Sequence, residues 1–248
     1  MRPLTRREFV AAAGAAAAST PFAARLAAIS AAEEPAAQAA GTVLFQGDSI
    51  TDGGRTRTVV EPNVPRALGT GYPLLVASAM MRAQPDAAWR FFNRGVSGDR
   101  VPELETRWDE DAIALKPDIL TVLVGVNDYW HTKLRNYTGT AADYENGFVA
   151  LLERTQRSLP ALRLIVLEPF VLPVGFVDQS WFPDFHERRA AARRVATRVS
   201  ATWIPLQEQF DELAAETGPA YWAADGVHPT PAGHEVIAAS VMRDLGGG

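Results

Sequence analysis

The segment Thr42–Ser49 reads TVLFQGDS, a short apolar run that passes into a glycine, an aspartate and a serine. Its first five residues are mostly apolar, β-branched or aromatic, which is typical of a strand buried on both faces of a sheet. Four other runs of this kind lie at residues 89–93, 119–124, 162–167 and 202–205. The sequence therefore predicts a sheet of five strands.

Longer stretches with helical character separate these runs. They span residues 73–82, 102–115, 141–158, 184–200, 207–216 and 231–245. Several begin with proline or follow a capping residue such as Thr140. Because strands and helices alternate, the sheet should be parallel and covered on both faces. Right-handed crossovers narrow the topology to a doubly wound sheet.

Composition limits the classes of protein that fit. The chain has 248 residues, of which 47% are apolar, and this suits one α/β domain with a substantial core. The net charge is −5 and no basic stripe is present, so a nucleic-acid partner is not expected. The absence of cysteine excludes a disulfide scaffold, a thiolate zinc site and a cysteine nucleophile.

The first forty residues have the features of an export leader. The paired arginines Arg6 and Arg7 precede an alanine-rich stretch at residues 11–28, a pattern that resembles a bacterial twin-arginine signal. The alternative is an amphipathic helix in which the two arginines are there by chance. We therefore expect a leader over residues 1–40 and a single mature domain over residues 41–248.

The leader predicts where the protein works. The expected partner is the twin-arginine export machinery, and the expected location is secreted or periplasmic. No later apolar run reaches the ~20 residues that span a bilayer, so no stable membrane insertion is expected after processing.

A serine, an aspartate and a histidine occupy positions from which they could act together. Ser49 follows the first expected strand, and the sequence DGVHP places Asp225 three residues before His228. A serine hydroxyl needs a neighbouring base to become a nucleophile, and an acidic side chain can fix the tautomer of that base. Taken separately, each segment also fits a structural role, because Gly-Asp-Ser can cap a helix and the second motif can be a polar loop.

Two further segments contain candidate oxyanion donors. Gly98 lies in the glycine-punctuated loop NRGVSGD at residues 93–99, and Asn127 ends the buried run LVGVN at residues 123–127. The backbone N–H of Gly98, the amide of Asn127 and the N–H of Ser49 would suit the oxyanion of ester hydrolysis. The structural alternatives are a tight turn at Gly98 and a cap at Asn127.

All these residues follow expected strands or lie in the loop before the last helix. Ligands of open α/β sheets bind beyond the carboxyl ends of the strands. We therefore expect the five residues to meet at one edge of the sheet.

The four segments, in this order, resemble the sequence blocks of the GDSL-type lipases and esterases, also called SGNH hydrolases. The resemblance runs from about residue 43 to residue 239, with Ile50 where the family name has leucine. It implies a flavodoxin-like, three-layer α/β/α sandwich without a cofactor or metal. It also implies a nucleophile, a base and an orienting acid at Ser49, His228 and Asp225, and oxyanion donors at Ser49, Gly98 and Asn127.

The expected function is that of an exported serine esterase that works through an acyl-enzyme. A short acyl group on a carbohydrate, such as acetyl, is the favoured substrate, and a lysophospholipase or lipase-like acylhydrolase is the alternative. A carbohydrate-binding protein that has lost its chemistry is a third interpretation.

Other residues have weaker signals. We expect surface or capping roles for the three remaining histidines, which are His131, His186 and His234.

The aromatic segment 181–185 could cover the site, although packing under a long loop is favoured. Tyr129 and Trp130 could line the pocket. Loop-supporting roles, as in ion pairs, are expected for Asp52, Arg100 and Asp128.

Overall fold

The structure is a computed structural model that describes residues 41–246 of the chain. The expected export leader, residues 1–40, lies outside the described residues. Among the described helices, none is both long enough and apolar enough to cross a bilayer.

A five-stranded sheet forms the centre of the domain, with every strand pair parallel. Its strands are β1 (Thr42–Gly47), β2 (Arg90–Asn93), β3 (Ile119–Leu123), β4 (Arg163–Leu167) and β5 (Thr202–Ile204). Their spatial order is β2-β1-β3-β4-β5. The predicted doubly wound, flavodoxin-like sheet is thus confirmed, with strand bounds within two residues of those expected.

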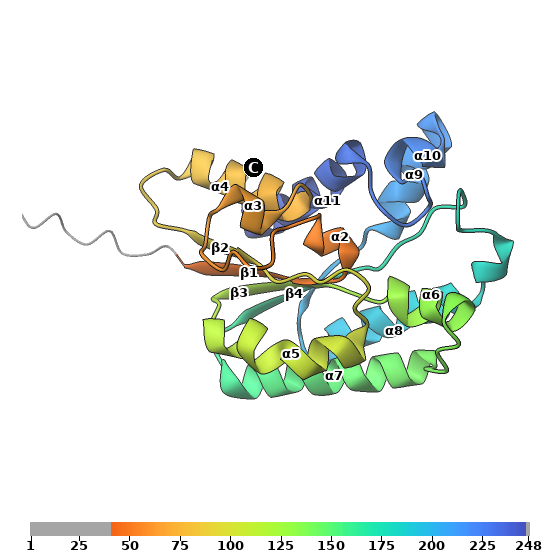
Figure 1. The fold of residues 1–248 in the computed structure, drawn as a ribbon, viewed down its shortest axis with the longest axis horizontal. Coiled ribbons are helices and arrows are strands. Elements are labelled where there is room, and N and C mark those ends of the chain that lie inside the picture. The colour runs from red at the N-terminus through yellow and green to blue at the C-terminus, as the bar shows by residue number, and fades with distance from the viewer. Residues whose placement is uncertain (1–40, 247–248) are drawn as a thin grey trace, which may run out of the picture. The chain divides into compact units, whose positions relative to one another are not determined.

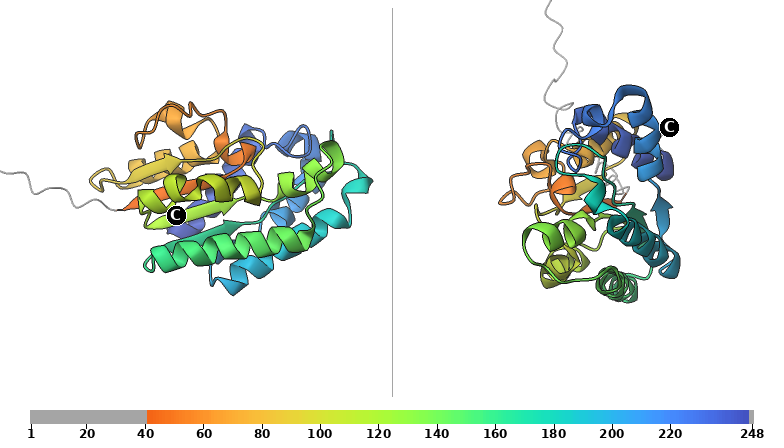
Figure 2. Two further views of the ribbon diagram at one scale, coloured as in Figure 1. Left: turned by 60° about the horizontal axis from the view of Figure 1, so that its bottom comes forward. Right: turned by 90° about the vertical axis from the view of Figure 1, so that its right-hand side faces the viewer.

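Helices cover both faces of the sheet, which gives the three layers visible in Figures 1 and 2. On one face lie α3 (Pro65–Leu68), α4 (Tyr72–Ala83), α9 (Gln207–Thr217) and α11 (Pro231–Leu245). On the other lie α5 (Val101–Asp111), α7 (Ala141–Ser158) and α8 (Asp184–Arg198). Shorter elements are α2 (Ser49–Asp52), α6 (Val126–Leu134), α10 (Pro219–Trp222) and 3-10 turns at Ile113–Leu115 and Gln179–Trp181.

Two apolar clusters fill the spaces between the layers. The first packs side chains such as Tyr72 and Val76 of α4, with Ile237 of α11, against the sheet. The second packs α5, α7 and α8 against the other face, and includes Trp108, whose indole donates to Thr155 Oγ1 at 2.8 Å, and Phe148. Buried apolar surface of this kind is the main stabilising contribution in such a domain.

The strand order changes direction beside β1. From β1 the chain crosses to β2 on one side, and then to β3 on the other side of β1. A crevice forms at such a switch point, beyond the carboxyl ends of the strands. The loops after β1, β2 and β3 therefore carry Ser49, Gly98 and Asn127 to the same edge.

The helix prediction missed the short elements. A four-residue helix such as α2 has no apolar periodicity to detect, and it is defined instead by the capping bond from Ile50 N–H to Asp48 Oδ1. Helix α6 begins directly after Gly125, and its sequence VNDYWHTKL mixes polar and apolar residues too evenly to stand out. The expected helix over 102–115 is interrupted at Ala112, which separates α5 from a 3-10 turn.

The loop after β2 packs closely on α2 at Gly95. A Cβ at this position would lie 2.4 Å from the backbone nitrogen of Asp52 and 2.8 Å from the carbonyl carbon of Thr51. Since backbone atoms cannot move aside cheaply, we expect Gly95→Ala to lower the free energy of unfolding by about 1–3 kcal/mol. Urea denaturation measures the difference.

Gly147, within α7, provides the matched control. Among the described residues, its added Cβ would meet only Val101 Cγ1, at 3.1 Å, and alanine gains up to about 1 kcal/mol of helix propensity. Gly147→Ala should therefore stay within about 1 kcal/mol of the wild type. Equal stability of the two variants would show that the Gly95 contact is not tight.

Candidate active site

Ser49 is the first residue of α2, two positions after β1 ends. The preceding Asp48 is buried, and its Oδ1 accepts from Ile50 N–H at 3.0 Å. At the other end of this single turn, Gly53 adopts a left-handed conformation and its N–H donates to Ser49 O. The short helix thereby holds the serine in one orientation at the edge of the sheet.

A chain of hydrogen bonds joins Ser49 to two residues from the other end of the sequence. The distance from Ser49 Oγ to His228 Nε2 is 2.9 Å, and that from His228 Nδ1 to Asp225 Oδ2 is 2.7 Å. Both are within hydrogen-bonding range. The arrangement can remove a proton from the serine hydroxyl, with the carboxylate fixing the imidazole tautomer.

Asp225 is held by the backbone of its own loop. Its Oδ1 accepts from the N–H groups of Val227 and His228, at 2.9 and 2.7 Å. Partial burial raises the pKa of Asp225, but the hydrogen bonds from the His228 ring and from both backbone groups outweigh it, and the pKa lies below its ordinary value. The carboxylate therefore stays ionised.

The segment 172–177 forms backbone hydrogen bonds to the loop that contains Asp225. Leu172 N–H donates to Gly226 O at 2.8 Å, and Phe176 N–H donates to Asp225 O at 2.9 Å. Gly226 has φ +87°, and a Cβ there would lie 2.3 Å from Val174 O. The segment 172–177 and the loop 225–228 are thus in direct backbone contact.

A cavity of about 160 Å³ opens beside the serine. It is lined by Ser49, Ser97, Gly98, Asn127, Trp130, His131, Leu134, Arg135 and His228. Four of the five residues expected from the sequence therefore share one cavity, and the fifth, Asp225, contacts the imidazole from behind.

The Asn127 amide is oriented toward the loop that carries Gly98. Its Nδ2 donates to Asp99 O at 3.2 Å, which leaves the second hydrogen of the amide free for another acceptor. Gly98 has φ +88°, and no atom of the described part of the chain lies within 4 Å of the position a Cβ would take. This backbone is thus open to an approaching ligand, and the site can present several donors to a negative oxygen.

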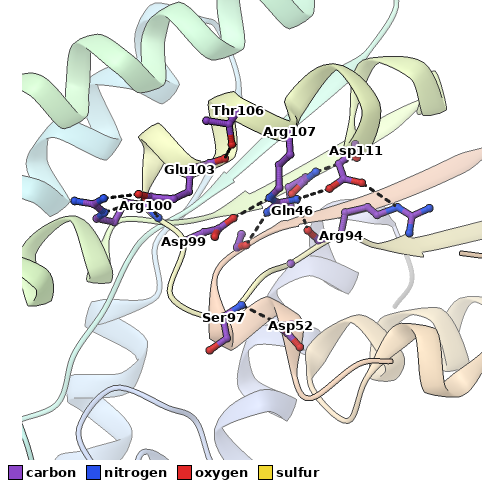
Figure 3. A network of polar contacts seen from close by, with 12 residues as sticks. Gln46, Asp52, Arg94, Ser97, Asp99, Arg100, Glu103, Thr106, Arg107 and Asp111 are labelled. Carbon is purple, nitrogen blue, oxygen red and sulfur yellow. Dashed lines mark hydrogen bonds and ion pairs between the residues drawn. The ribbon is translucent and has the colours of Figure 1, made fainter. Parts of the chain in front are cut away.

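Arg107 of α5 anchors the same loop, as Figure 3 shows. Its guanidinium donates to Asp99 Oδ2 at 2.8 Å and to Arg94 O at 2.7 Å. From the other side, Asp52 Oδ2 accepts from Ser97 N–H at 3.0 Å. Arg107 was not among the residues expected at the site, although its pairing with Asp111 one helical turn later is a detectable i,i+4 signal.

Two carboxyl groups are buried behind the cavity. Burial, only partly offset by a backbone hydrogen bond to each group, raises the pKa of Asp48 and of Asp128 to about 7. Asp128 Oδ1 accepts from Val101 N–H at 3.2 Å, and Oδ2 of each residue has no hydrogen-bond partner among residues 41–246. Asp128 therefore supports the loop before α5, as expected, but through the backbone and not through an ion pair.

The other supporting roles expected from sequence are ionic. Asp52 pairs with Arg57, and Arg100 pairs with Glu103. The prediction that Tyr129 and Trp130 line the pocket is half correct, because Trp130 lines it while Tyr129 is buried against Trp181.

The surface or capping roles expected for the remaining histidines hold for His186 and for His234, which accepts from the first N–H of α4, and are wrong for His131. His186 is exposed, but His131 is buried in the cavity wall. His234 is partly buried, its Nδ1 accepts from Tyr72 N–H at 3.2 Å, and burial together with the nearby His228 lowers its pKa to about 4.

The aromatic segment 181–185 packs into the core and does not cover the site. Trp181 and Phe185 are 2% and 0% exposed and contact each other. This confirms the packing role that the sequence favoured. Within residues 41–246, no three histidine or acidic side chains are grouped so as to hold a metal ion.

A parallel α/β/α sheet with a serine, a histidine and an aspartate hydrogen-bonded at its carboxyl edge has the arrangement of a serine hydrolase. Comparison with known proteins agrees. Residues 45–236 match the model of the GDSL-like Lipase/Acylhydrolase family. The acetylxylan esterase of Geobacillus stearothermophilus is 33% identical over 210 residues, which cover 82% of this chain and 93% of that protein.

Solved structures show the same relationship. A GDSL-like lipase from Parabacteroides merdae superposes with a TM-score of 0.82 at 38% identity, covering 85% of this chain and 98% of the other. Axe2, an acetylxylan esterase from Geobacillus stearothermophilus, gives a TM-score of 0.75 at 30% identity, covering 84% and 95%. The chain belongs to the GDSL-like lipase/acylhydrolase (SGNH) family and is a carboxylic ester hydrolase.

Because Asp128 is buried, we expect its replacement by the neutral isostere asparagine to change the free energy of unfolding by an amount that depends on pH. Because the pKa is about 7 in the folded chain and near 3.8 in the unfolded one, the wild type loses stability as the pH rises from about 4 to 7. Asp128→Asn has no such loss and keeps the acceptor for Val101. Its free energy of unfolding, relative to wild type, should increase by about 2–3 kcal/mol between pH 5 and pH 8.

Asp143 at the start of α7 is the control. Hydrogen bonds from the backbone and side chain of Thr140 hold its pKa below the ordinary value, so it is ionised at both pH values, folded or unfolded. The effect of Asp143→Asn should be equal at pH 5 and pH 8. A pH-independent effect of Asp128→Asn would contradict the ionisation described here.

Proposed function

We propose that the protein removes short acyl groups, above all acetyl, from hydroxyl groups of carbohydrates. The observation that carries this proposal is the hydrogen-bonded chain from Ser49 through His228 to Asp225, which opens on a small cavity. In this proposal Ser49 is the nucleophile, His228 is the general base and Asp225 orients it. The oxyanion donors are Ser49 N–H, Gly98 N–H and the Asn127 amide.

The reaction proceeds in two halves. Ser49 Oγ attacks the ester carbonyl while His228 Nε2 takes the hydroxyl proton, and the carbonyl oxygen becomes a negative oxyanion held by the three donors. The tetrahedral intermediate collapses, and His228 returns the proton to the leaving alcohol. Water then attacks the acyl-enzyme with His228 as base, which releases the carboxylic acid and restores Ser49.

The relatives support these assignments. Two structures of Axe2 are described as catalytic mutants, one with a serine replaced and one with a histidine replaced, at positions 179 residues apart. Ser49 and His228 are also separated by 179 residues. Equal spacing in a chain that is 30% identical supports equivalent roles for the two pairs.

The space beside Ser49 fits a small acyl group next to a larger alcohol part. The cavity that contains Ser49 has a volume of about 160 Å³, and a hollow of about 480 Å³ adjoins it and shares Ser97, Gly98, His131 and Arg135 with it. Axe2 is described as an acetyl-xylooligosaccharide esterase. This relative favours acetyl on a sugar hydroxyl over the long acyl chain of a lysophospholipid.

We also propose that residues 1–40 direct export of the folded domain through the twin-arginine route, to a secreted or periplasmic location. The support is the arginine pair before the alanine-rich stretch. Polysaccharide substrates outside the cytoplasm agree with such a location.

The proposed reaction is tested by comparing esters of different acyl length and by substituting Ser49 and Asn127. The wild type should have a higher kcat/KM for 4-nitrophenyl acetate than for 4-nitrophenyl octanoate, and should release acetate from acetylated xylo-oligosaccharides. Ser49→Ala should lose nearly all turnover on both, while Asn127→Ala should lose about 10²–10³-fold, because one of three donors is removed.

Circular dichroism of both variants shows whether folding is intact. A preference for the eight-carbon ester would contradict the acetyl proposal and favour the lipase-like alternative. Full activity of a folded Ser49→Ala variant would contradict the assignment of the nucleophile.

The export proposal is tested with the full-length chain in a bacterium that has the twin-arginine machinery. Replacing Arg6 and Arg7 together by lysine should leave the precursor in the cytoplasm, because the pair is the signal that the machinery reads. Fractionation and immunoblotting measure the distribution. Unchanged export of the variant would argue against this route.

A further inference from the structure

Aromatic side chains gather beside the imidazole of His228. The ring of Trp130, on α6, lies 6.0 Å from the His228 ring between centroids. The ring of Phe176 lies 5.5 Å from that of Trp130, and Trp181 lies 5.9 Å from Trp130 on the core side. Trp130 also lines the cavity that contains Ser49, so this group of rings continues the cavity wall.

Phe176 has a fixed backbone and an exposed side chain. Its N–H donates to Asp225 O at 2.9 Å, and its carbonyl accepts from Trp181 Nε1, also at 2.9 Å. The side chain is nevertheless 62% exposed. The backbone of Phe176 is therefore held by the same loop that holds Asp225, while most of the residue is open to solvent.

The placement of exposed apolar side chains is uneven. Among the described residues, the large apolar side chains that are more than half exposed are Val60, Leu134, Phe176 and Tyr221. Leu134 lines the cavity, and Phe176 contacts Trp130 at its wall. Two of these four residues thus lie at or beside the cavity, where a ligand can cover them.

The reaction geometry determines which part of the ester lies against the rings of Trp130 and Phe176. In the tetrahedral intermediate the oxyanion faces Gly98 and Asn127, and the leaving oxygen must lie within reach of His228 Nε2. The alcohol part of the ester therefore lies beside His228, next to Trp130. The acyl group extends in the remaining direction and does not need this wall.

We propose that Trp130 and Phe176 form a platform that binds a pyranose ring of the carbohydrate leaving group. One face of a pyranose presents C–H groups, which pack on aromatic rings, while its hydroxyl groups need polar partners. Arg135 and His131 supply such partners on the same cavity wall. This inference rests on the proposed function and assigns the sugar side of the site.

The test compares two acetate esters with different alcohols. The probes are methyl xylopyranoside acetates, which have a sugar ring, and vinyl acetate, which has no ring. We expect Phe176→Ala to lower kcat/KM for the sugar acetates about tenfold more than for vinyl acetate, mainly through KM, because the apolar contact is lost only with the sugar. Phe176→Trp should restore the preference, since it keeps an aromatic face.

Tyr221→Ala is the matched control. Tyr221 is an aromatic residue that is 58% exposed and packs on Trp222, away from the cavity lining. It should leave the ratio of the two kcat/KM values unchanged.

Three results would overturn the platform. The first is an equal loss of kcat/KM on both esters, which would mean that Phe176 acts only through the Asp225 loop. The second is no loss on either ester. The third is a loss confined to 4-nitrophenyl octanoate, which would mean that the rings bind an acyl chain. Failure of the proposed function gives a different result. In that case the wild type itself would cleave vinyl acetate but no sugar acetate.

Discussion

The 2.9 Å contact between Ser49 Oγ and His228 Nε2 joins two segments that are 179 residues apart, and much of the fold serves to hold it. Ser49 is fixed by the single turn of α2 at the end of β1. His228 is fixed by Asp225, whose loop rests on the segment 172–177. Each partner is therefore positioned by backbone hydrogen bonds, so little conformational freedom remains to be lost when a substrate binds.

The sheet and most long helices could be predicted from the sequence because their signals are local. The helix over 141–158 and the helix over 231–245 have the expected bounds, and each has a capping threonine before it. Convergence of the five site residues at one edge also followed from parallel topology. Here the family resemblance and the strand pattern lead to the same arrangement.

What could not be predicted depends on contacts between distant segments. Arg107 looks like any surface helix residue until the loop 94–99 is folded against it. Likewise, nothing in the sequence shows that the ring of Phe176 lies against Trp130, whereas Trp181 is buried. Burial of Asp48 and Asp128 is equally hidden, because aspartate next to a motif usually faces solvent. Buried acids of this kind lower the free energy of unfolding, and such losses of stability are common at functional sites.

The spacing of Ser49 and His228 has a consequence for assembly. Ser49 follows β1 and His228 lies in the loop before α11, so β2, β3, β4 and β5 all lie between them along the chain. Pairings of such long sequence separation carry a loop-closure cost that slows folding. A chain cut before Asp225 would keep the residues of all five strands but lack the imidazole that Ser49 Oγ contacts. Esterase turnover therefore reports that both ends of the domain are in place, and not only that the sheet has formed.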